Sequence, residues 1–178
     1  MRQEIRFSGF GGQGVVLMGY ILGRAFVIYE NMEAVMTQAY GPEARGGASS
    51  SNMVVSEEPV DYPFVAQPDI LVALSQEAYT KFRPTAKEGA TIIIDSGLVT
   101  PTEDDVVHGI PATRLAEELG RRIVANVVML GFFTAVTEVV KRESLEKAIE
   151  ASVKPKTLDL NMKAFSAGYE YALQKEAG

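Results

Sequence analysis

The sequence contains no cysteine and only one histidine, His108, among its 178 residues. The absence of cysteine excludes disulfides, thiolate nucleophiles, cysteine-ligated iron–sulfur clusters and cysteine-based zinc sites in this chain. A histidine-rich metal site or a Ser-His-Asp triad would have to use His108, and no Gly-x-Ser-x-Gly nucleophile elbow is present. We therefore expect His108 to be structural, and we expect the chain to hold no metal and to supply no catalytic residue.

Basic residues are also scarce, with 17 Lys and Arg against 23 Asp and Glu, for a net charge of −6. A nucleic-acid binder needs a basic face that neutralises phosphates, and this composition supplies no general one. Residues 1–6 are charged, and no apolar signal-peptide region follows them. The most apolar run, 15–29, is interrupted by Arg24 and is shorter than the ~20 residues that span a bilayer. We expect a cytoplasmic protein that binds neither nucleic acid nor membrane.

Short apolar segments alternate with helical patterns along the chain, which has the length of one domain, residues 1–178. The patterns predict strands at 4–9, 33–38, 52–56, 69–74, 90–95 and 105–110. They predict helices at 13–30, 76–82, 112–120, 126–141, 144–153 and 160–175, with Asn126 as a possible N-cap and Gly120 as a C-cap. This order predicts an α/β fold: a three-layer α/β/α domain with a mostly parallel sheet and helices concentrated in the C-terminal half.

The helices predicted at 13–30 and 126–141 are apolar almost all round. Such helices are buried on more than one side. Both belong either to a compact core of this chain or, in part, to a surface that another subunit covers.

Gly9, Gly11 and Gly14 form a G-x-G-x-x-G pattern between the first predicted strand and the first predicted helix. Glycines at a helix N-terminus let a phosphate approach the backbone N–H groups. A dinucleotide site also needs a carboxylate at the tip of the second strand, where this chain has none. The chain has neither a Walker A loop nor a Gly-Asp-Gly thiamine motif. The glycines alone are equally compatible with a tight turn that binds nothing.

A second glycine-rich segment, 40–52, combines Glu43, Arg45, Gly46 and Gly47 with three serines. An arginine fork, converging N–H groups and hydroxyls can form an anion-binding nest. The alternative is a solvated loop in which Glu43 and Arg45 form an ordinary surface ion pair.

Several segments, in order along the chain, resemble the gamma subunit of the 2-oxoacid:ferredoxin oxidoreductases. They are GFGGQG at 9–14, YGPEARGG at 40–47, DILVALSQEAY at 69–79, IPAT at 110–113 and ANVVMLG at 125–131. The pattern is most like the 2-oxoglutarate enzymes, with the branched-chain and pyruvate enzymes close behind.

The resemblance implies a complex that oxidatively decarboxylates a 2-oxoacid to its acyl-CoA and reduces ferredoxin. It implies thiamine diphosphate, Mg and iron–sulfur clusters on alpha, beta and ferredoxin-like delta subunits, with coenzyme A as co-substrate. The gamma chain would help to form the subunit interface and the surroundings of coenzyme A and the active site. The candidate cofactor-binding residues carried over by motif are Gly11, Gly12, Gln13, Gly14, Glu43, Arg45, Gly46 and Gly47.

Three hypotheses follow: an essential but individually inactive subunit, a stand-alone Rossmann-type dinucleotide-binding protein, and a purely structural scaffold subunit. A Rossmann protein would bind a dinucleotide as an isolated chain. The subunit hypothesis predicts that Arg45→Ala raises the KM for coenzyme A or lowers turnover in the assembled complex, whereas the scaffold hypothesis predicts no change.

Overall fold

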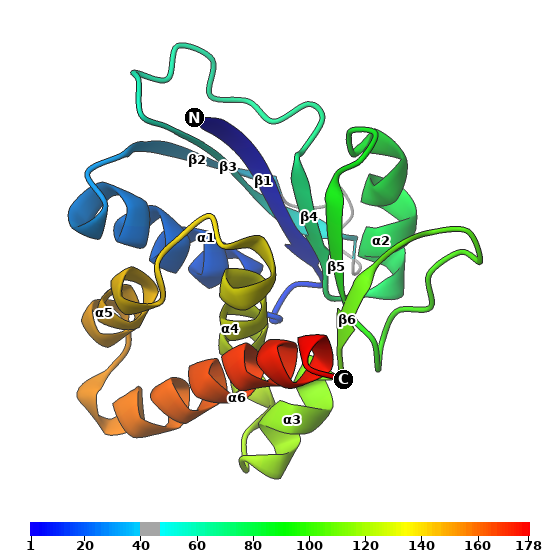
Figure 1. Ribbon diagram of the computed structural model, residues 1–178, viewed down its shortest axis with the longest axis vertical. Coiled ribbons are helices and arrows are strands. Elements are labelled where there is room, and N and C mark those ends of the chain that lie inside the picture. The colour runs from blue at the N-terminus through cyan, green and yellow to red at the C-terminus, as the bar shows by residue number, and fades with distance from the viewer. Residues whose placement is uncertain (40–46) are drawn as a thin grey trace.

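The computed structural model describes residues 1–39 and 47–178 and contains one six-stranded sheet in the order β2-β3-β1-β4-β5-β6 (Figure 1). The strands are β1 Arg2–Gly9, β2 Glu33–Ala39, β3 Ser49–Ser56, β4 Ile70–Ala73, β5 Thr91–Asp95 and β6 His108–Ile110. β1, β4, β5 and β6 pair in parallel, whereas β3 is antiparallel to both β1 and β2. The predicted α/β class is confirmed, with a mixed sheet.

β3 is three residues longer at its start than the sequence predicted. The sequence predicted a loop at residues 49–51, because clusters of serine favour turns. In the structure they pair on both sides, Ser49 with Gly9 of β1 and Ser50 with Ala39 of β2. Two neighbouring ladders therefore outweigh the local preference of serine.

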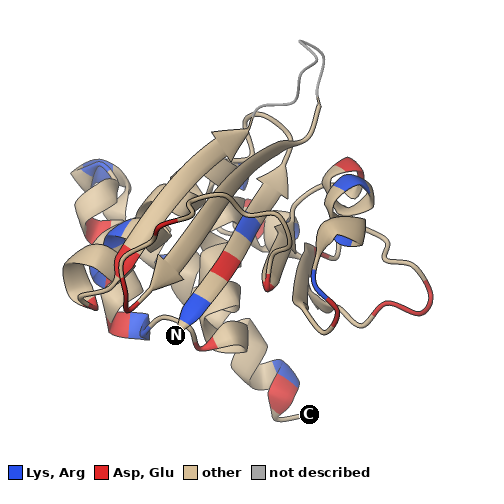
Figure 2. Ribbon diagram, turned by 90° about the horizontal axis from the view of Figure 1, so that it is seen from above, with Lys and Arg blue, Asp and Glu red and all other residues tan. Residues whose placement is uncertain are grey.

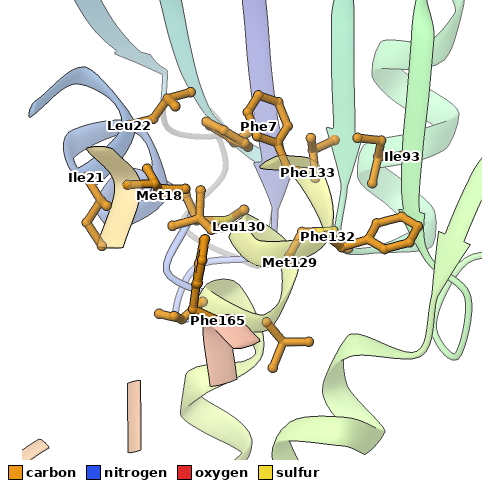
Figure 3. Packing of buried hydrophobic residues seen from close by; sticks show 14 of the residues in the cluster. Phe7, Met18, Ile21, Leu22, Ile93, Met129, Leu130, Phe132, Phe133 and Phe165 are labelled. Atoms are coloured by element: carbon orange, nitrogen blue, oxygen red, sulfur yellow. The ribbon is translucent and has the colours of Figure 1, made fainter. Parts of the chain in front are cut away.

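Five helices cover one face of the sheet: α1 Val15–Arg24, α3 Ala112–Glu118, α4 Ala125–Thr137, α5 Arg142–Ser152 and α6 Leu158–Glu176 (Figure 1). α1 continues into a π-helical turn, η1, at Ala25–Tyr29. The main core lies between these helices and the sheet. Figure 3 shows Phe7 of β1 against Phe133 of α4, with ring centroids 5.5 Å apart.

α4 is the central helix of this layer, and every residue from Asn126 to Thr134 is buried. α6 crosses it at a pair of glycines, Gly131 on α4 and Gly168 on α6. A Cβ on Gly131 would lie 2.0 Å from the carbonyl oxygen of Phe165, and one on Gly168 would lie 1.8 Å from that of Val128. The two helix backbones can therefore approach closely only because both positions lack a side chain.

In the part of the chain that the structure describes, the opposite face carries one α-helix, α2 Gln76–Phe82, and a smaller apolar cluster that includes Leu71 and Ile92. Asp105 accepts hydrogen bonds from Arg83 at the end of α2, and this contact lowers the pKa of the Asp105 carboxyl. Beside the helix, Arg6 of β1 donates to the Asn52 side chain at 2.6 Å and to the Val65 carbonyl at 2.7 Å. Burial lowers the pKa of Arg6.

Figure 2 shows the charged residues gathered mainly on the outer helices and loops, with alternating charges on β1 as the main exception within the sheet. On the helical face of β1 stand Ile5 and Phe7, both fully buried.

No helix in residues 1–39 or 47–178 is long and apolar enough to cross a membrane.

The predicted elements are all present, but several ends differ. The first helix begins at Val15 rather than 13, and the last strand begins at His108 rather than 105. The prediction that Asn126 is the N-cap of α4 is wrong. Val124 holds the N-cap position, and Asn126 is buried within the first turn of the helix. Gly120 just beyond α3 has a φ of 100°, as a glycine at a helix end requires.

Candidate functional site

The loop between β1 and α1 contains the first glycine motif. Gly12 and Gly14 have φ values of 89° and 76°, a left-handed conformation that favours glycine. Gly14 serves as the N-cap of α1, and a Cβ there would lie 2.3 Å from the Asn126 side-chain nitrogen. These two glycines are therefore needed by the fold itself.

Gly11 differs from both. Its φ lies outside the left-handed region, and an added Cβ would meet no described atom within 4 Å. Gly11 is exposed beside Phe10, which is 39% exposed. Nothing in the described part of the chain requires glycine at position 11.

The side-chain amide of Gln13 bridges the loop to the neighbouring strand. Its Oε1 accepts a hydrogen bond from the Phe10 backbone at 2.6 Å, and its Nε2 donates to the carbonyl of Leu74, just after β4, at 2.9 Å. β1 and β4 are the parallel pair at which the strand order reverses, the place where open α/β sheets bind ligands. Gln13 thus ties the glycine loop to the end of β4 at this crevice.

The sheet brings the end of the second glycine motif next to the first. Ser49, two residues after Gly47, pairs directly with Gly9, which opens the glycine loop. Glu43, Arg45 and Gly46 lie outside the described residues. Eight site residues were predicted. The structure places four of them in the β1–α1 loop: Gly11, Gly12, Gln13 and Gly14. It places Gly47 two residues before β3, the strand that pairs with β1.

A groove of about 830 Å³ opens on the outer side of this loop. Gly11, Gly12 and Gly14 form part of its wall, Ser49 lies at its sheet side, and Arg121 borders it. Most of the remaining lining is apolar and comes from α1, from β2, from the segment that leads into α4, and from the region between the end of α5 and the first turn of α6. These lining residues include Val16, Leu17, Tyr20, Met36, Ile123, Val124, Val153 and Leu160.

A smaller cavity of about 270 Å³ lies at the carboxyl ends of β1, β4 and β5, next to Gly12 and Gln13. Asp95, 1% exposed, forms part of its wall. Its carboxylate accepts from the Thr113 backbone at 3.0 Å and hydroxyl at 2.7 Å, and from Gly97 N–H at 3.0 Å. These bonds tie β5 to the start of α3, so Asp95 has a structural task.

Sequence reasoning missed the segment between α3 and α4. Arg122 lines the small cavity, Arg121 lines the groove, and Ile123, 68% exposed, borders both. The only local signal for a turn at this segment was Gly120, which follows a predicted helix and precedes Arg121 and Arg122. That signal says nothing about a cavity. His108 is exposed at the start of β6 and lines neither cavity.

Comparison with known proteins identifies the class. A sequence model of the pyruvate ferredoxin/flavodoxin oxidoreductase family matches residues 4–171, and the chain belongs to this family. It is 55% identical to the 2-oxoglutarate synthase subunit KorC of Methanocaldococcus jannaschii, over 97% of this chain and 95% of that protein. The chain is accordingly a gamma subunit of a 2-oxoacid:ferredoxin oxidoreductase, similar to the KorC subunits of 2-oxoglutarate synthases.

Solved structures agree with this assignment. The gamma subunit of the keto/oxoacid ferredoxin oxidoreductase from Geobacter sulfurreducens matches with a TM-score of 0.89 and 44% identity, over 98% of both chains. The 2-oxoglutarate:ferredoxin oxidoreductase from Magnetococcus marinus, solved with 2-oxoglutarate, coenzyme A and succinyl-CoA, shares the fold at a TM-score of 0.87 and 23% identity.

Two of the relatives carry this fold within a longer chain. The match covers 97% of this chain but 31% of the Magnetococcus chain. The ketoisovalerate oxidoreductase subunit VorA of Methanothermobacter thermautotrophicus is 37% identical over 98% of this chain, which corresponds to 37% of VorA.

Proposed function

We propose that this chain forms one wall of the coenzyme A site in an oxidoreductase that converts 2-oxoglutarate to its acyl-CoA. The observation that carries the proposal is the groove of about 830 Å³ that opens at the glycine loop. A slender and partly apolar pantetheine arm fits an apolar groove, and a diphosphate fits an opening bordered by glycines at the start of α1 and by Arg121.

Individual residues have different tasks in this proposal. Gly11 and Gly12 leave room for the diphosphate to approach the backbone, and Gly14 lets α1 begin at that point. Gln13 acts indirectly, since its amide is engaged by Phe10 and Leu74 and so fixes the shape of the loop. The second motif adds the candidates Glu43, Arg45, Gly46 and Gly47, with the Arg45 guanidinium as the hydrogen-bond donor to an anion.

The rest of the chemistry belongs to other subunits. Because the sequence has no cysteine, cysteine ligation of iron–sulfur clusters must be provided by a partner. Thiamine diphosphate and Mg are assigned to the alpha and beta subunits, clusters to a ferredoxin-like delta subunit, and ferredoxin is the electron acceptor. The cytoplasmic location and the extent of the domain, residues 1–178, stay predictions.

Steady-state kinetics of the assembled complex test the role of the loop. We expect Gly11→Ala to raise the KM for coenzyme A about tenfold, equivalent to ~1.4 kcal/mol, because a methyl group would occupy the approach to the loop. The KM for 2-oxoglutarate should stay unchanged. The matched control is Gly23→Ala on α1, whose added Cβ faces Met53 rather than the groove.

Arg45→Ala is expected to act in the same direction, because it removes a charged donor without adding bulk. If complexes with Gly11→Ala and Arg45→Ala retain all subunits and show the wild-type KM for coenzyme A, the chain is a scaffold and the proposal is wrong. The stand-alone dinucleotide-binding alternative is not favoured, since the chain belongs to the pyruvate ferredoxin/flavodoxin oxidoreductase family and is similar to KorC subunits along nearly its whole length.

A further inference from the structure

Asn126 is a buried polar residue at the start of an otherwise apolar helix. The other residues of the segment 125–133 carry no polar side chain, yet Asn126 is 4% exposed within the first turn of α4. Asparagine has a low helix propensity, and a buried amide needs hydrogen-bond partners for both its oxygen and its nitrogen. The fold alone gives little reason for asparagine at this position, so its contacts decide what it does.

Two neighbours fix the orientation of the Asn126 amide. Its Oδ1 accepts a hydrogen bond from the backbone N–H of Val127 at 2.9 Å, and its Nδ2 lies 3.4 Å from the carbonyl oxygen of Gly14. Exchanging the oxygen and the nitrogen would place donor against donor and acceptor against acceptor. The amide nitrogen therefore faces the glycine loop.

The amide nitrogen of Asn126 carries two hydrogens, and its own chain uses them poorly. The contact with Gly14 is long, since N–H···O bonds usually measure about 2.7–3.2 Å. Within residues 1–39 and 47–178 this nitrogen has no second acceptor. Asn126 also lines the groove of about 830 Å³, beside Gly14. A buried donor of this kind in the wall of a groove indicates an acceptor on the molecule that the groove binds.

The start of α1, next to this amide, offers further donors. Its N-cap residue Gly14 has no side chain that could accept from the first N–H groups of the helix. At the start of α2, by contrast, Ser75 Oγ accepts from the Ala78 N–H at 3.1 Å. Arg121 borders the same groove as Gly14 and Asn126. Uncapped N–H groups, an amide nitrogen and an arginine at one place favour an anion.

We infer that Asn126 is a binding residue for coenzyme A, and that its amide nitrogen donates a hydrogen bond to an oxygen of the diphosphate. The inference rests on the proposed function, which supplies the ligand and its position at the glycine loop. The diphosphate suits this nitrogen because its oxygens only accept hydrogen bonds. The amide then bridges Gly14 and the ligand, and α4 supplies a contact that neither glycine motif contains.

Two replacements at position 126, studied by steady-state kinetics of the assembled complex, test the inference. Asn126→Leu has a similar size but no donor, and we expect it to raise the KM for coenzyme A about tenfold. Asn126→Asp keeps an acceptor for the Val127 N–H but puts a negative charge beside the diphosphate. We expect it to raise this KM about hundredfold. The kcat and the KM for 2-oxoglutarate should stay unchanged with both.

The order of the two effects separates ligand binding from a role in the fold. An acidic residue in the first turn of a helix stabilises that helix, so a structural role alone would make Asn126→Asp the milder change. Raising the ionic strength should bring the KM of Asn126→Asp closer to that of Asn126→Leu, because mobile ions screen the repulsion between two negative charges.

The matched control is Thr134→Val on the same helix. Thr134 is 2% exposed, its Oγ1 donates to the Leu130 carbonyl at 2.7 Å, and it lines neither the groove nor the small cavity. This variant also loses a buried hydrogen bond of α4, and we expect it to keep the wild-type KM for coenzyme A. Subunit retention and the melting temperature of each complex show whether the assembly is intact.

The outcomes distinguish this inference from the proposed function. If Gly11→Ala raises the KM for coenzyme A but both Asn126 variants keep the wild-type value, the inference is wrong and the proposed function stands. The same holds if Thr134→Val raises this KM as much, or if neither Asn126 variant assembles, because Asn126 then serves the fold. If Gly11→Ala, Arg45→Ala and both Asn126 variants all leave the KM unchanged, the proposed function fails and the inference fails with it.

Discussion

Two helices of similar composition have opposite surroundings in this protein. α4 has no charged residue and is buried from Asn126 to Thr134, because α1, α3, α6 and the sheet surround it. The helix of residues 15–29 has one charged residue and packs against the sheet, α4 and α5, but several large apolar side chains on its outer face stay exposed. A largely apolar helix sequence therefore does not by itself determine how much of the helix its own chain buries.

The largest expected difference between the two helices concerns truncation of a large side chain. Phe133→Ala on α4 should lower the free energy of unfolding by about 3–5 kcal/mol, because it leaves a cavity beside Phe7. Ile28→Ala on η1, where the side chain is 64% exposed, should change it by less than about 0.5 kcal/mol in the isolated chain. Urea unfolding of both variants measures the difference, and equal losses would contradict the comparison.

A smaller effect is expected where α4 crosses α6. Gly131→Ala places a methyl group 2.0 Å from a backbone carbonyl of α6, so the helices must move apart. We expect a loss of about 2–3 kcal/mol in thermal or urea unfolding, since the gain in helix propensity offsets only about 1 kcal/mol of the overpacking. A variant as stable as the wild type would show that this crossing is loosely packed.

The smallest effects are expected on α1, where the two glycines differ. A Cβ on Gly19 would lie 2.0 Å from Ser51 Oγ and 2.8 Å from Met36 Sδ, whereas one on Gly23 would meet only the end of Met53 at 3.2 Å. Gly19→Ala should therefore destabilise the chain by about 1 kcal/mol. Gly23→Ala should stabilise it by up to about 1 kcal/mol through helix propensity. Melting temperatures of the two variants, measured side by side, give the sign of each change.

The sequence predicted most elements because local patterns determine them. The continuous apolar runs at 70–73 and 92–94 lie in the buried parallel strands β4 and β5, and the glycine motif joins β1 to α1 as expected. The start of β3 was missed, because the pairing of Ser49–Ser51 depends on two strands distant in the sequence. The π-turn at Ala25–Tyr29 likewise has no local signal that a helical pattern can reveal.

The candidate site was predicted only in part for a related reason. Motifs identified the glycine loop, but the groove beside it is built from segments up to about 150 residues apart in the sequence, including Arg121 and Asn126 near α4 and Leu160 of α6. Their proximity is set by tertiary packing. The hydrogen bonds of the Gln13 side-chain amide could not be predicted either. The sequence of a glycine-rich loop does not show whether a glutamine in it faces a ligand or the protein's own backbone.

The hydrogen bonds of Gln13 also set where the glycine loop stands between two open spaces. The cavity of about 270 Å³ at the ends of the parallel strands lies next to Gln13, and the groove of about 830 Å³ lies next to Gly11 and Gly14. Gly12 borders both spaces, so a side chain added at that one position would change the wall of each.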